Sequence, residues 1–231
     1  MIVALVPAYN EEKRISEVVR QSYQFVDKVL VCDDGSTDST YRLSVEAGAE
    51  VIKHKRNLGY GASLRSLFLE AGRIPADAFV TVDSDGQHDP KFIPALAKQI
   101  LNDQADIVIG SRFLSGATSH TPPVRRLLIK LITRLCDPTG VYGLTDLQSG
   151  FRAYGERALA VTCPTRLGMG ASTEIIRRAT SSYLRIREVP VPIYYDVERN
   201  PLFRSAVQFL DVVGSTLSLN LPRNGEKRER F

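Results

Sequence analysis

Short apolar runs rich in β-branched residues alternate with helical patterns over the first half of the chain. The apolar runs predict strands over residues 2–6, 28–32, 50–53, 78–82 and 106–110. Between them, apolar residues at helical spacing predict helices over residues 11–24, 37–47, 60–72 and 90–102. Repeated strand–helix units are typical of a mostly parallel sheet that carries helices on both faces. The sequence therefore predicts an α/β fold.

The pattern is less regular after residue 112. It predicts a loop over 115–123, helices near 124–136, 170–181 and 202–219, and an edge strand over the VPVPIYY segment at 189–195. No apolar run approaches the roughly 18 residues that a membrane-spanning helix needs. The apolar segment at the start of the sequence has no basic residues before it and is followed by a charged residue, Glu11, so we expect no signal peptide.

Polar residues or glycines follow each of the first five predicted strands. They are Asn10, Asp33-Asp34-Gly35, Asn57, Asp83-Ser84-Asp85-Gly86 and Gly110-Ser111-Arg112. The carboxyl ends of parallel strands meet at one edge of a sheet, and ligands of open α/β sheets bind at that edge. We therefore expect these five loops to form one site, with Arg112 exposed in it.

Two carboxylates, Asp83 and Asp85, stand two residues apart after a buried strand. Their repulsion would cost stability unless a cation lies between them and an anion. Carboxylate oxygens, together with the Gln87 carbonyl, suit Mg2+ or Mn2+ bound to a diphosphate. A simple turn is the alternative, because Asp and Gly are turn formers. For the neighbouring His88 we expect a structural role.

The segment VCDDGSTDST places Asp33 and Asp34 at the end of the second predicted strand. A base N–H or a ribose hydroxyl that donates to a carboxylate would explain one of these aspartates. The pocket would also be lined by Pro7, Tyr9 and Glu11. Ser36 or Thr37 is expected to be the N-cap of the following helix. The chain lacks both GxGxxG and GxxxxGK[ST], which argues against a dinucleotide dehydrogenase and a P-loop ATPase.

Charge is distributed unevenly along a chain of otherwise ordinary globular composition. Residues 1–109 carry 12 Lys and Arg against 16 Asp and Glu, whereas residues 110–231 carry 18 against 10. The basic second half favours an anionic membrane surface or a phosphorylated substrate over nucleic acid, because no nucleic-acid-binding motif is present. The three cysteines show no paired spacing, so we expect reduced thiols in the cytoplasm and no structural zinc.

Six motifs follow one another along the chain. They are PAYNEE at 7–12, CDDGSTD at 32–38, RNLGYG at 56–61, DSDGQHDP at 83–90, GSRF at 110–113 and DLQSGFR at 146–152. In this order they resemble the inverting glycosyltransferases of family 2, and within them the dolichyl-phosphate mannose synthases and related polyprenyl-phosphate sugar synthases. The resemblance implies the GT-A fold, a Rossmann-like, mostly parallel sheet flanked by helices with a C-terminal extension on the acceptor side. It also implies one catalytic domain over 1–201, with a nucleotide-binding half at 1–112 and an acceptor half at 113–201, followed by a helix and basic tail at 202–231.

The resemblance further implies roles for individual positions. The donor nucleotide would be bound by Pro7, Tyr9, Glu11, Asp33, Asp34 and Asp83. The divalent metal, Mg2+ or Mn2+, would be bound by Asp83, Asp85 and Gln87. Catalysis would fall to Asp85 and Arg112, and the acceptor phosphate would be bound by Arg126, Lys130 and Arg199. Lys130 departs from the serine common in mannose synthases, and the segment ERNP around Arg199 departs from the usual ending of the motif.

The helix VRRLLIKLITRL combines a basic stripe with apolar residues. Arg126, Lys130 and Arg134 recur at i, i+4 and i+8 on one face. Another face holds Val124, Leu127, Leu128, Leu131 and Leu135. Such a helix can lie in a membrane interface with its cations on lipid phosphates, or pack on the core with a solvated basic face. With the resemblance, membrane docking is the expectation: a peripheral enzyme on the cytoplasmic face, with a separate membrane partner protein left open.

The expected reaction is in-line attack of a lipid phosphate oxygen on the anomeric carbon of a GDP- or UDP-sugar, with inversion. A phosphate monoester has a second pKa of about 6 and needs cationic orientation more than a base. A hydroxyl acceptor would instead need a base. Asp146 or Glu174 could be that base, although ion pairs with Arg152 and Arg177 would equally explain them. Two alternatives stay open: a family 2 transferase with a hydroxyl acceptor, and a non-catalytic nucleotide-sugar-binding membrane adaptor.

Overall fold

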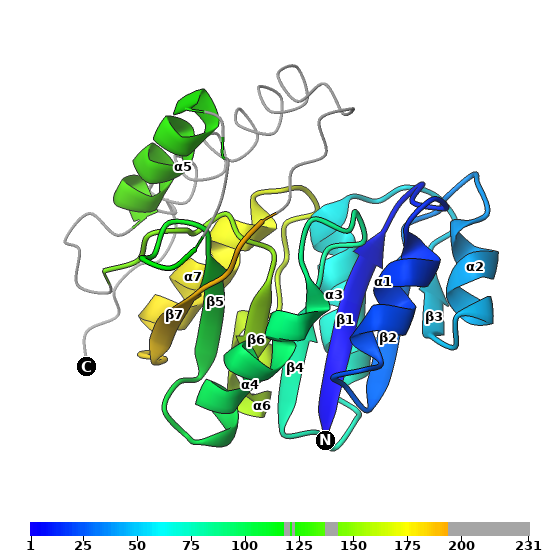
Figure 1. Cartoon of the computed structure of the whole chain (residues 1–231), viewed down its shortest axis with the longest axis horizontal. Helices are drawn as coiled ribbons and strands as arrows, with labels where there is room; N and C mark the ends of the chain where they lie inside the picture. The colour runs from blue at the N-terminus through cyan, green and yellow to red at the C-terminus, as the bar shows by residue number, and fades with distance from the viewer. Residues whose placement is uncertain (118–120, 122, 137–142, 194–231) are drawn as a thin grey trace, which may run out of the picture.

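A seven-stranded sheet forms the centre of the computed structural model (Figure 1), which describes residues 1–117, 121, 123–136 and 143–193. The strands are β1 (Ile2–Ala8), β2 (Lys28–Asp33), β3 (Glu50–Lys53), β4 (Ala78–Thr81), β5 (Ile107–Ser111), β6 (Arg152–Tyr154) and β7 (Ile186–Pro190). Their spatial order is β3-β2-β1-β4-β6-β5-β7. All pairings are parallel except those of β6, which runs antiparallel to both β4 and β5. The α/β sheet expected from the sequence is thus confirmed.

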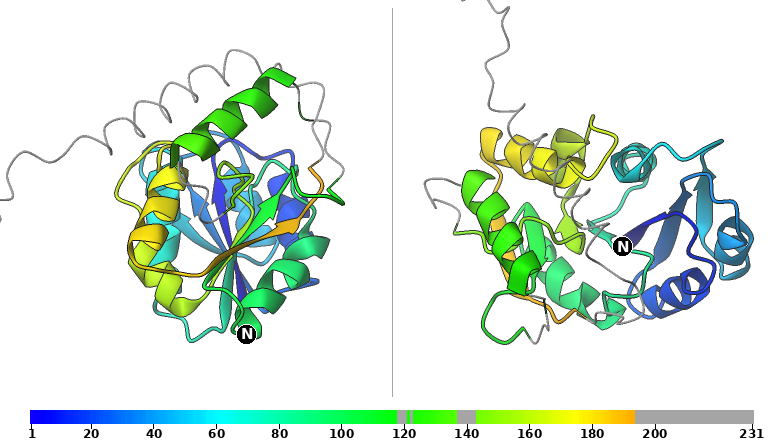
Figure 2. Two further views of the ribbon diagram at one scale, coloured as in Figure 1. Left: turned by 90° about the vertical axis from the view of Figure 1, so that its left-hand side faces the viewer. Right: turned by 90° about the horizontal axis from the view of Figure 1, so that it is seen from above.

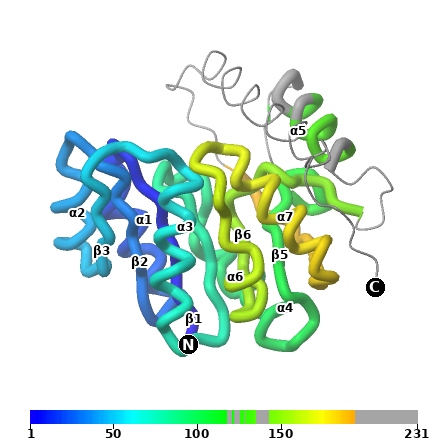
Figure 3. Tube along the Cα trace, turned by 180° about the vertical axis from the view of Figure 1, so that it is seen from behind, coloured from blue at the N-terminus to red at the C-terminus, as the bar shows by residue number. Residues whose placement is uncertain are grey.

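Helices cover both faces of the sheet. The helices of the described residues are α1 (Ile15–Ser22), α2 (Thr40–Glu46), α3 (Tyr60–Ala71), α4 (Ile93–Leu101), α5 (Pro123–Cys136), α6 (Glu156–Thr162) and α7 (Ala171–Ser181), with a short 3-10 turn at Pro90–Phe92, and all of them except α5 lie on a face of the sheet. Figure 1 looks onto the face with α1 and α4, and Figure 3 onto the face with α3, α6 and α7. Alternate strand residues feed the two cores: Ala4 and Val6 pack with α1 and α4, and Val3 and Leu5 pack with α3.

The strands predicted in the first half of the chain are all present, and their ends differ from the prediction by at most two residues. The last described strand, β7, begins at Ile186 and ends at Pro190, so residues 191–193 of the predicted VPVPIYY strand are not part of it, and residues 194–195 lie outside the described residues. Proline lacks the N–H that a strand pairing needs, which limits the continuation through Pro192. The predicted helix over 202–219 and the domain boundary at 201 lie outside the described residues.

Two elements were not predicted from the sequence, β6 and α6. Strand β6 has three residues, too few for an alternating pattern to stand out, and α6 has seven. Because β6 is antiparallel, its first residue, Arg152, pairs with Thr81 and Ile109 near the carboxyl ends of β4 and β5. The loop that precedes β6 therefore lies at the same sheet edge as the loops that follow its neighbours. The hydroxyl of Thr81 fixes it there by donating to the Gly150 carbonyl at 2.6 Å.

Helix α5 lies across the carboxyl edge of the sheet rather than on either face (Figures 1 and 2). Among the described side chains of this helix, Ile129, Ile132 and Thr133 are buried. Leu127 and Leu131, predicted to lie on an apolar face apart from the cations, are 68% and 50% exposed. Ile129 and Ile132, on another side of the helix, are the apolar residues that pack against the rest of the protein instead. Within the described residues, none of the helices combines the length and apolar content needed to cross a bilayer.

Candidate functional site

The loops after β1 and β2 hold each other in place at the carboxyl edge of the sheet. The amide of Asn10 donates to the Ser36 hydroxyl at 2.9 Å, and the Asn10 side chain accepts from the Thr37 amide at 2.9 Å. Asn10 has φ 54°, a left-handed conformation that asparagine tolerates better than most residues. The expectation that Ser36 or Thr37 caps the next helix is wrong, because α2 begins at Thr40 and both residues serve this loop junction.

The two aspartates at the carboxyl end of β2, Asp33 and Asp34, have different surroundings. Asp34 is buried and accepts from His54 Nδ1 at 2.7 Å and from the amides of Leu58 and Gly59 at 3.0 and 2.8 Å. It therefore fixes the loop before α3. Asp33 is also buried, and its Oδ1 accepts from the Ser36 amide at 3.1 Å. Its Oδ2 has no hydrogen-bond partner among the described residues, which leaves an acceptor that a ligand donor could still use.

The β1 loop contributes three of the predicted donor residues. Pro7 is buried at the end of β1, Glu11 is half-buried and Tyr9 is 41% exposed. The charge of Glu11 acts on Asp85, where it is one of the causes that raise the pKa of that carboxyl. The structure thus places the β1 loop and the DSD loop next to one another, as the sequence predicts for loops at one edge.

The carboxylates of the DSD loop are close enough to perturb each other. Burial, followed by the charge of Asp83, raises the pKa of Asp85. The Gln87 amide donates to Asp85 Oδ1 at 3.0 Å, as in a turn. A Cβ at Gly150 would lie only 2.6 Å from both carboxylate oxygens of Asp83, so only glycine allows the loop before β6 to approach this side chain.

The His88 ring lies next to the Asp83 carboxylate. The ring is buried and stacks on Phe151 with centroids 5.0 Å apart. Burial lowers the pKa of His88 to about 4, so the ring is neutral near pH 7. Its Nδ1 is 3.5 Å from Asp83 Oδ2 and makes no hydrogen bond within the part of the chain that the structure describes. The expected structural role agrees with this packing.

The donor set of the DSD loop fits a hard divalent cation. Two mutually repelling carboxylates gain most from a positive charge, and oxygen atoms are the ligands that Mg2+ and Mn2+ prefer. Across residues 1–117, 121, 123–136 and 143–193, no cluster of three or more His, Cys, Asp and Glu residues is arranged to hold a metal. A cation held by Asp83 and Asp85, with Gln87 close by, would complete its shell with ligand oxygens and water, as Mg2+ commonly does.

Arg112 and Asp146 form a buried, bidentate ion pair. Arg112 Nε lies 2.5 Å from Asp146 Oδ2, and Nη2 lies 2.6 Å from Oδ1. The Arg112 amide adds a third bond to Oδ2 at 3.1 Å. Asp146 is fully buried and Arg112 is 6% exposed, so the expectation of an exposed Arg112 is wrong. The compensating carboxylate, 34 residues away in sequence, explains how a guanidinium can be buried here.

The two carboxylates considered as bases are both engaged, with partners other than those expected. Asp146 binds Arg112 rather than Arg152, whose guanidinium donates instead to the carbonyls of Leu147, Ser149 and Ser172. Glu174 pairs with Arg178 at 2.9 Å, and its carboxylate also accepts from Thr165 and from the Arg166 amide. A proton-abstracting role for either carboxylate would require these bonds to break.

A cavity of about 240 Å3 opens beside the Arg112–Asp146 pair. It is lined by Arg112, Phe113, Leu114, Ser115, Gly116, Ala117, Thr121 and Arg126. The Phe113 ring is close to two guanidinium groups, those of Arg112 and Arg126, each 5.6 Å from its centroid. The structure thereby brings Arg112, predicted to be catalytic, close to Arg126, predicted to bind the acceptor phosphate. Lys130 is exposed one turn further along α5 and does not line this cavity, and Arg199 lies outside the described residues.

Comparison with known proteins adds a family and a fold. The sequence matches glycosyl transferase family 2 over residues 3–162. A UDP-N-acetylglucosamine–dolichyl-phosphate N-acetylglucosaminyltransferase from Methanococcus voltae is 33% identical over 220 residues, which cover 84% of this chain and 86% of that protein. A dolichol-phosphate mannosyltransferase from Pyrococcus furiosus is 29% identical over 201 residues, 82% of this chain and 55% of that protein.

A solved structure shares the architecture. Glucosyl-3-phosphoglycerate synthase from Mycobacterium tuberculosis, in complex with Mn2+, UDP and phosphoglyceric acid, superimposes with a TM-score of 0.77 at 22% identity. The match covers 97% of this chain and 80% of that protein. The sheet order, the loops gathered at its carboxyl edge and the family match over residues 3–162 agree. The chain belongs to glycosyltransferase family 2 and is a glycosyltransferase with the GT-A fold.

Proposed function

We propose that this enzyme transfers a sugar from a nucleotide-sugar to a polyprenyl phosphate, with inversion and with the help of a divalent cation. The observation that carries the proposal is the presence, at one sheet edge, of the Asp83 and Asp85 carboxylates and of a cavity lined by Arg112 and Arg126. The first group suits a cation with a diphosphate, and the second suits a phosphate monoester. The names of relatives from Methanococcus voltae, Pyrococcus furiosus and Micrococcus luteus, all transferases to dolichyl or undecaprenyl phosphate, support the acceptor class.

The donor nucleotide would bind between the loops after β1 and β2. Asp33 Oδ2 is an unsatisfied buried acceptor there, which a base N–H or a ribose hydroxyl would satisfy. Tyr9 offers an exposed ring against which a base can stack. Pro7 and Glu11 would line the proposed pocket, and Asp34 would hold the neighbouring loop through the amides of Leu58 and Gly59. UDP-sugars are the first donors to test, because the relative from Methanococcus voltae is named for one and the solved structure contains UDP, while GDP-sugars remain the alternative.

Asp83, Asp85 and Gln87 would hold Mg2+ or Mn2+ on the donor diphosphate. The cation supplies positive charge that neutralises the departing nucleoside diphosphate. Arg112 supplies a second positive charge, held rigid by its two bonds to Asp146. A charge that needs no reorganisation during the reaction stabilises a developing anion more effectively than a mobile one.

The acceptor phosphate would enter the cavity between Arg112 and Arg126, with Lys130 further out. One phosphate oxygen attacks the anomeric carbon; the bond from that carbon to the diphosphate oxygen breaks, and its electron pair leaves with the nucleotide. With a second pKa of about 6, the phosphate is already anionic near neutrality and needs no base. This agrees with the engagement of Asp146 and Glu174 in other bonds.

Helix α5 would dock the enzyme on an anionic membrane surface. Leu127 and Leu131 are exposed on the same side of the helix as Arg126, Lys130 and Arg134. Leucines that enter the interface while neighbouring cations meet lipid phosphates are the recurring pattern of peripheral helices. Docking here would bring the cavity, whose lining includes Arg126 of this helix, close to the lipid headgroups.

A direct assay tests the proposal. The protein is incubated with Mn2+, a panel of UDP- and GDP-sugars and a short polyprenyl phosphate, and products are identified by mass spectrometry. We expect a glycosyl phosphopolyprenol from one donor, formed about 100-fold or more slowly by the Asp85→Asn variant. Transfer to the corresponding polyprenol, without the phosphate, would favour the hydroxyl-acceptor alternative. Donor binding without transfer to either acceptor would refute the polyprenyl-phosphate acceptor.

A further inference from the structure

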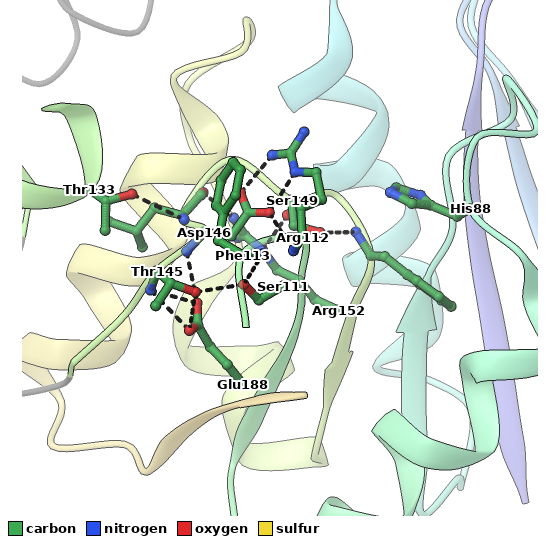
Figure 4. A network of polar contacts seen from close by, with 12 residues as sticks. His88, Ser111, Arg112, Phe113, Thr133, Thr145, Asp146, Ser149, Arg152 and Glu188 are labelled. Atoms are coloured by element: carbon green, nitrogen blue, oxygen red, sulfur yellow. Dashed lines mark hydrogen bonds and ion pairs between the residues drawn. The ribbon is translucent and has the colours of Figure 1, made fainter. Parts of the chain in front are cut away.

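The carboxylate of Glu188 binds the backbone of Asp146, the residue that pairs with Arg112 (Figure 4). Glu188 lies on β7, at the edge of the sheet, where it pairs in register with Ile109 of β5. Its two oxygens accept from the Thr145 amide at 2.9 Å, from the Thr145 hydroxyl at 2.7 Å and from the Asp146 amide at 2.9 Å. One side chain thus holds the backbone on both sides of the Thr145–Asp146 peptide.

Glu188 also sets the direction of a hydrogen-bond chain that ends beside Arg112. The Thr145 hydroxyl has a single proton and donates it to the Glu188 carboxylate. The Ser111 hydroxyl, 2.6 Å from Thr145 Oγ1, then donates to Thr145. Ser111 Oγ in turn accepts from the Phe113 amide at 3.1 Å. Arg112 is therefore held from two directions, through Asp146 and through the Ser111–Phe113 backbone that flanks it.

We propose that Glu188 is a positioning residue that fixes the guanidinium of Arg112 against the Phe113 ring, in the cavity beside α5. The inference rests on the proposed function, in which Arg112 contacts the acceptor phosphate and the departing diphosphate. Loss of Glu188 would leave the amides of Thr145 and Asp146 without their acceptor and free Asp146 to move. A displacement of about 1 Å can reduce turnover by about 100-fold.

The chain contains a matched control. Glu174 accepts from the Thr165 amide at 3.0 Å, the Thr165 hydroxyl at 2.7 Å and the Arg166 amide at 2.9 Å, the same three kinds of donor that Glu188 binds, and in addition pairs with Arg178. The segment that it holds packs on the start of α3, where the Leu167 carbonyl accepts from the Gly61 amide at 2.7 Å. Substitution of Glu174 therefore removes the same kind of local support without touching the Arg112–Asp146 pair.

The experiment compares Glu188→Ala, Glu188→Gln, Thr145→Val and Glu174→Gln by two readouts. The first is the 15N–1H signal of the Arg112 Nε–H group, assigned by its loss in Arg112→Lys, which reports the pair without any need for activity. The second is the steady-state kinetics of transfer to a short polyprenyl phosphate. We expect Glu188→Ala to shift the Nε–H signal and to lower kcat or raise the acceptor KM by about 10- to 100-fold, with a smaller effect on the nucleotide-sugar KM.

The other variants make the result specific. Glu188→Gln keeps one oxygen acceptor and should recover most of the signal and the activity. Thr145→Val removes the hydroxyl links but keeps both amides, and should give a smaller shift of the same kind. Glu174→Gln should lower the thermal midpoint with no change in the Nε–H signal or in the acceptor KM.

Unchanged signal and acceptor kinetics in folded Glu188→Ala would overturn the inference. If that variant does not fold, an unchanged signal in Thr145→Val would overturn it equally. A shifted signal in a protein that transfers to no polyprenyl phosphate would instead support Glu188 as a positioning residue and refute the proposed function.

Discussion

Glu174 and Glu188 bind the same kinds of donors, yet their pKa values are shifted in opposite directions. Burial opposes ionisation of Glu174, but the bonds from Thr165 and Arg166 and the charge of Arg178 outweigh it, so the pKa of Glu174 is lowered. For Glu188, burial dominates over the bonds from Thr145 and Asp146, and the pKa is raised. The charge of Asp146 adds to that rise, because its own counter-ion, Arg112, lies on its far side.

This contrast predicts opposite pH dependences for two variants. Glu174 stabilises the fold above its ordinary pKa of 4.5, and this contribution is lost as the pH falls through its lowered pKa, so the cost of Glu174→Gln should grow from pH 3.5 to pH 7. Glu188 has a raised pKa, so its contribution is complete below 4.5 and declines as the pH rises through the raised value. The cost of Glu188→Gln should therefore shrink over the same range. Urea unfolding midpoints at several pH values measure both slopes, and parallel slopes would contradict the assignment.

Asp85→Asn should separate activity from stability. Burial and the charge of Asp83 disfavour the ionised form of Asp85, so the neutral amide should leave the thermal midpoint unchanged or raise it. Turnover should fall by about 100-fold or more, as expected when one strong transition-state contact is lost. Full turnover in EDTA, or in this variant, would refute the proposed cation site; Asp27→Asn, at the amino end of the sheet, is the control with unchanged turnover.

Arg112→Ala should, in contrast, cost both activity and stability. It leaves the fully buried Asp146 carboxylate without its counter-ion, and breaking a buried pair in this way costs about 3–5 kcal/mol. The double variant Arg112→Met, Asp146→Leu should recover most of the free energy of unfolding but none of the activity. Denaturant unfolding of the single and double variants checks this, and a single variant as stable as the double one would argue against the pair.

Helix α5 shows how far an element could be predicted from sequence. Its position and its basic stripe follow from the spacing of Arg126, Lys130 and Arg134. The face that packs does not, because apolar residues occur all round the helix and periodicity cannot tell which of them meets the protein. Ile129 and Ile132 are buried, whereas Leu127 and Leu131 are exposed. Strand β6 could not be predicted for a related reason: its three residues are too few to show an alternation of apolar and polar positions.

The exposed leucines give a prediction for this element. Leu127→Ser with Leu131→Ser should weaken binding to vesicles that contain anionic lipid while leaving the thermal midpoint near that of the wild type, because both side chains already contact solvent. Arg134→Gln should weaken the same binding by about 1 kcal/mol, and less in high salt. Co-sedimentation with vesicles measures both effects. Leu69→Ser, equally exposed on α3, is the control that should bind normally.

Across the whole molecule, the sequence predicts the location of the site more fully than it predicts the contacts that hold the site together. The rule that strand ends meet at one edge is enough to gather Asp33, Asp85 and Arg112. The partners of these residues come from positions far along the chain, such as Asp146 for Arg112 and Gly150 beside Asp83. Burial of Arg112 could not be inferred, since it depends on a compensating charge that only the folded chain supplies.

The antiparallel strand β6 has a consequence for the order in which the chain can fold during synthesis. Strands β1 to β4 pair among themselves, so this half of the sheet can assemble once residue 81 has emerged. Strand β5 cannot join it then, because both of its neighbours, β6 and β7, are made later. Until residues 152–154 arrive, the nascent chain presents an open edge at β4 and an unpaired apolar β5. The proposed cation site after β4 and the proposed phosphate cavity after β5 are therefore expected to come into register only when β6 pairs with both strands, so a chain that lacks β6 should not be active.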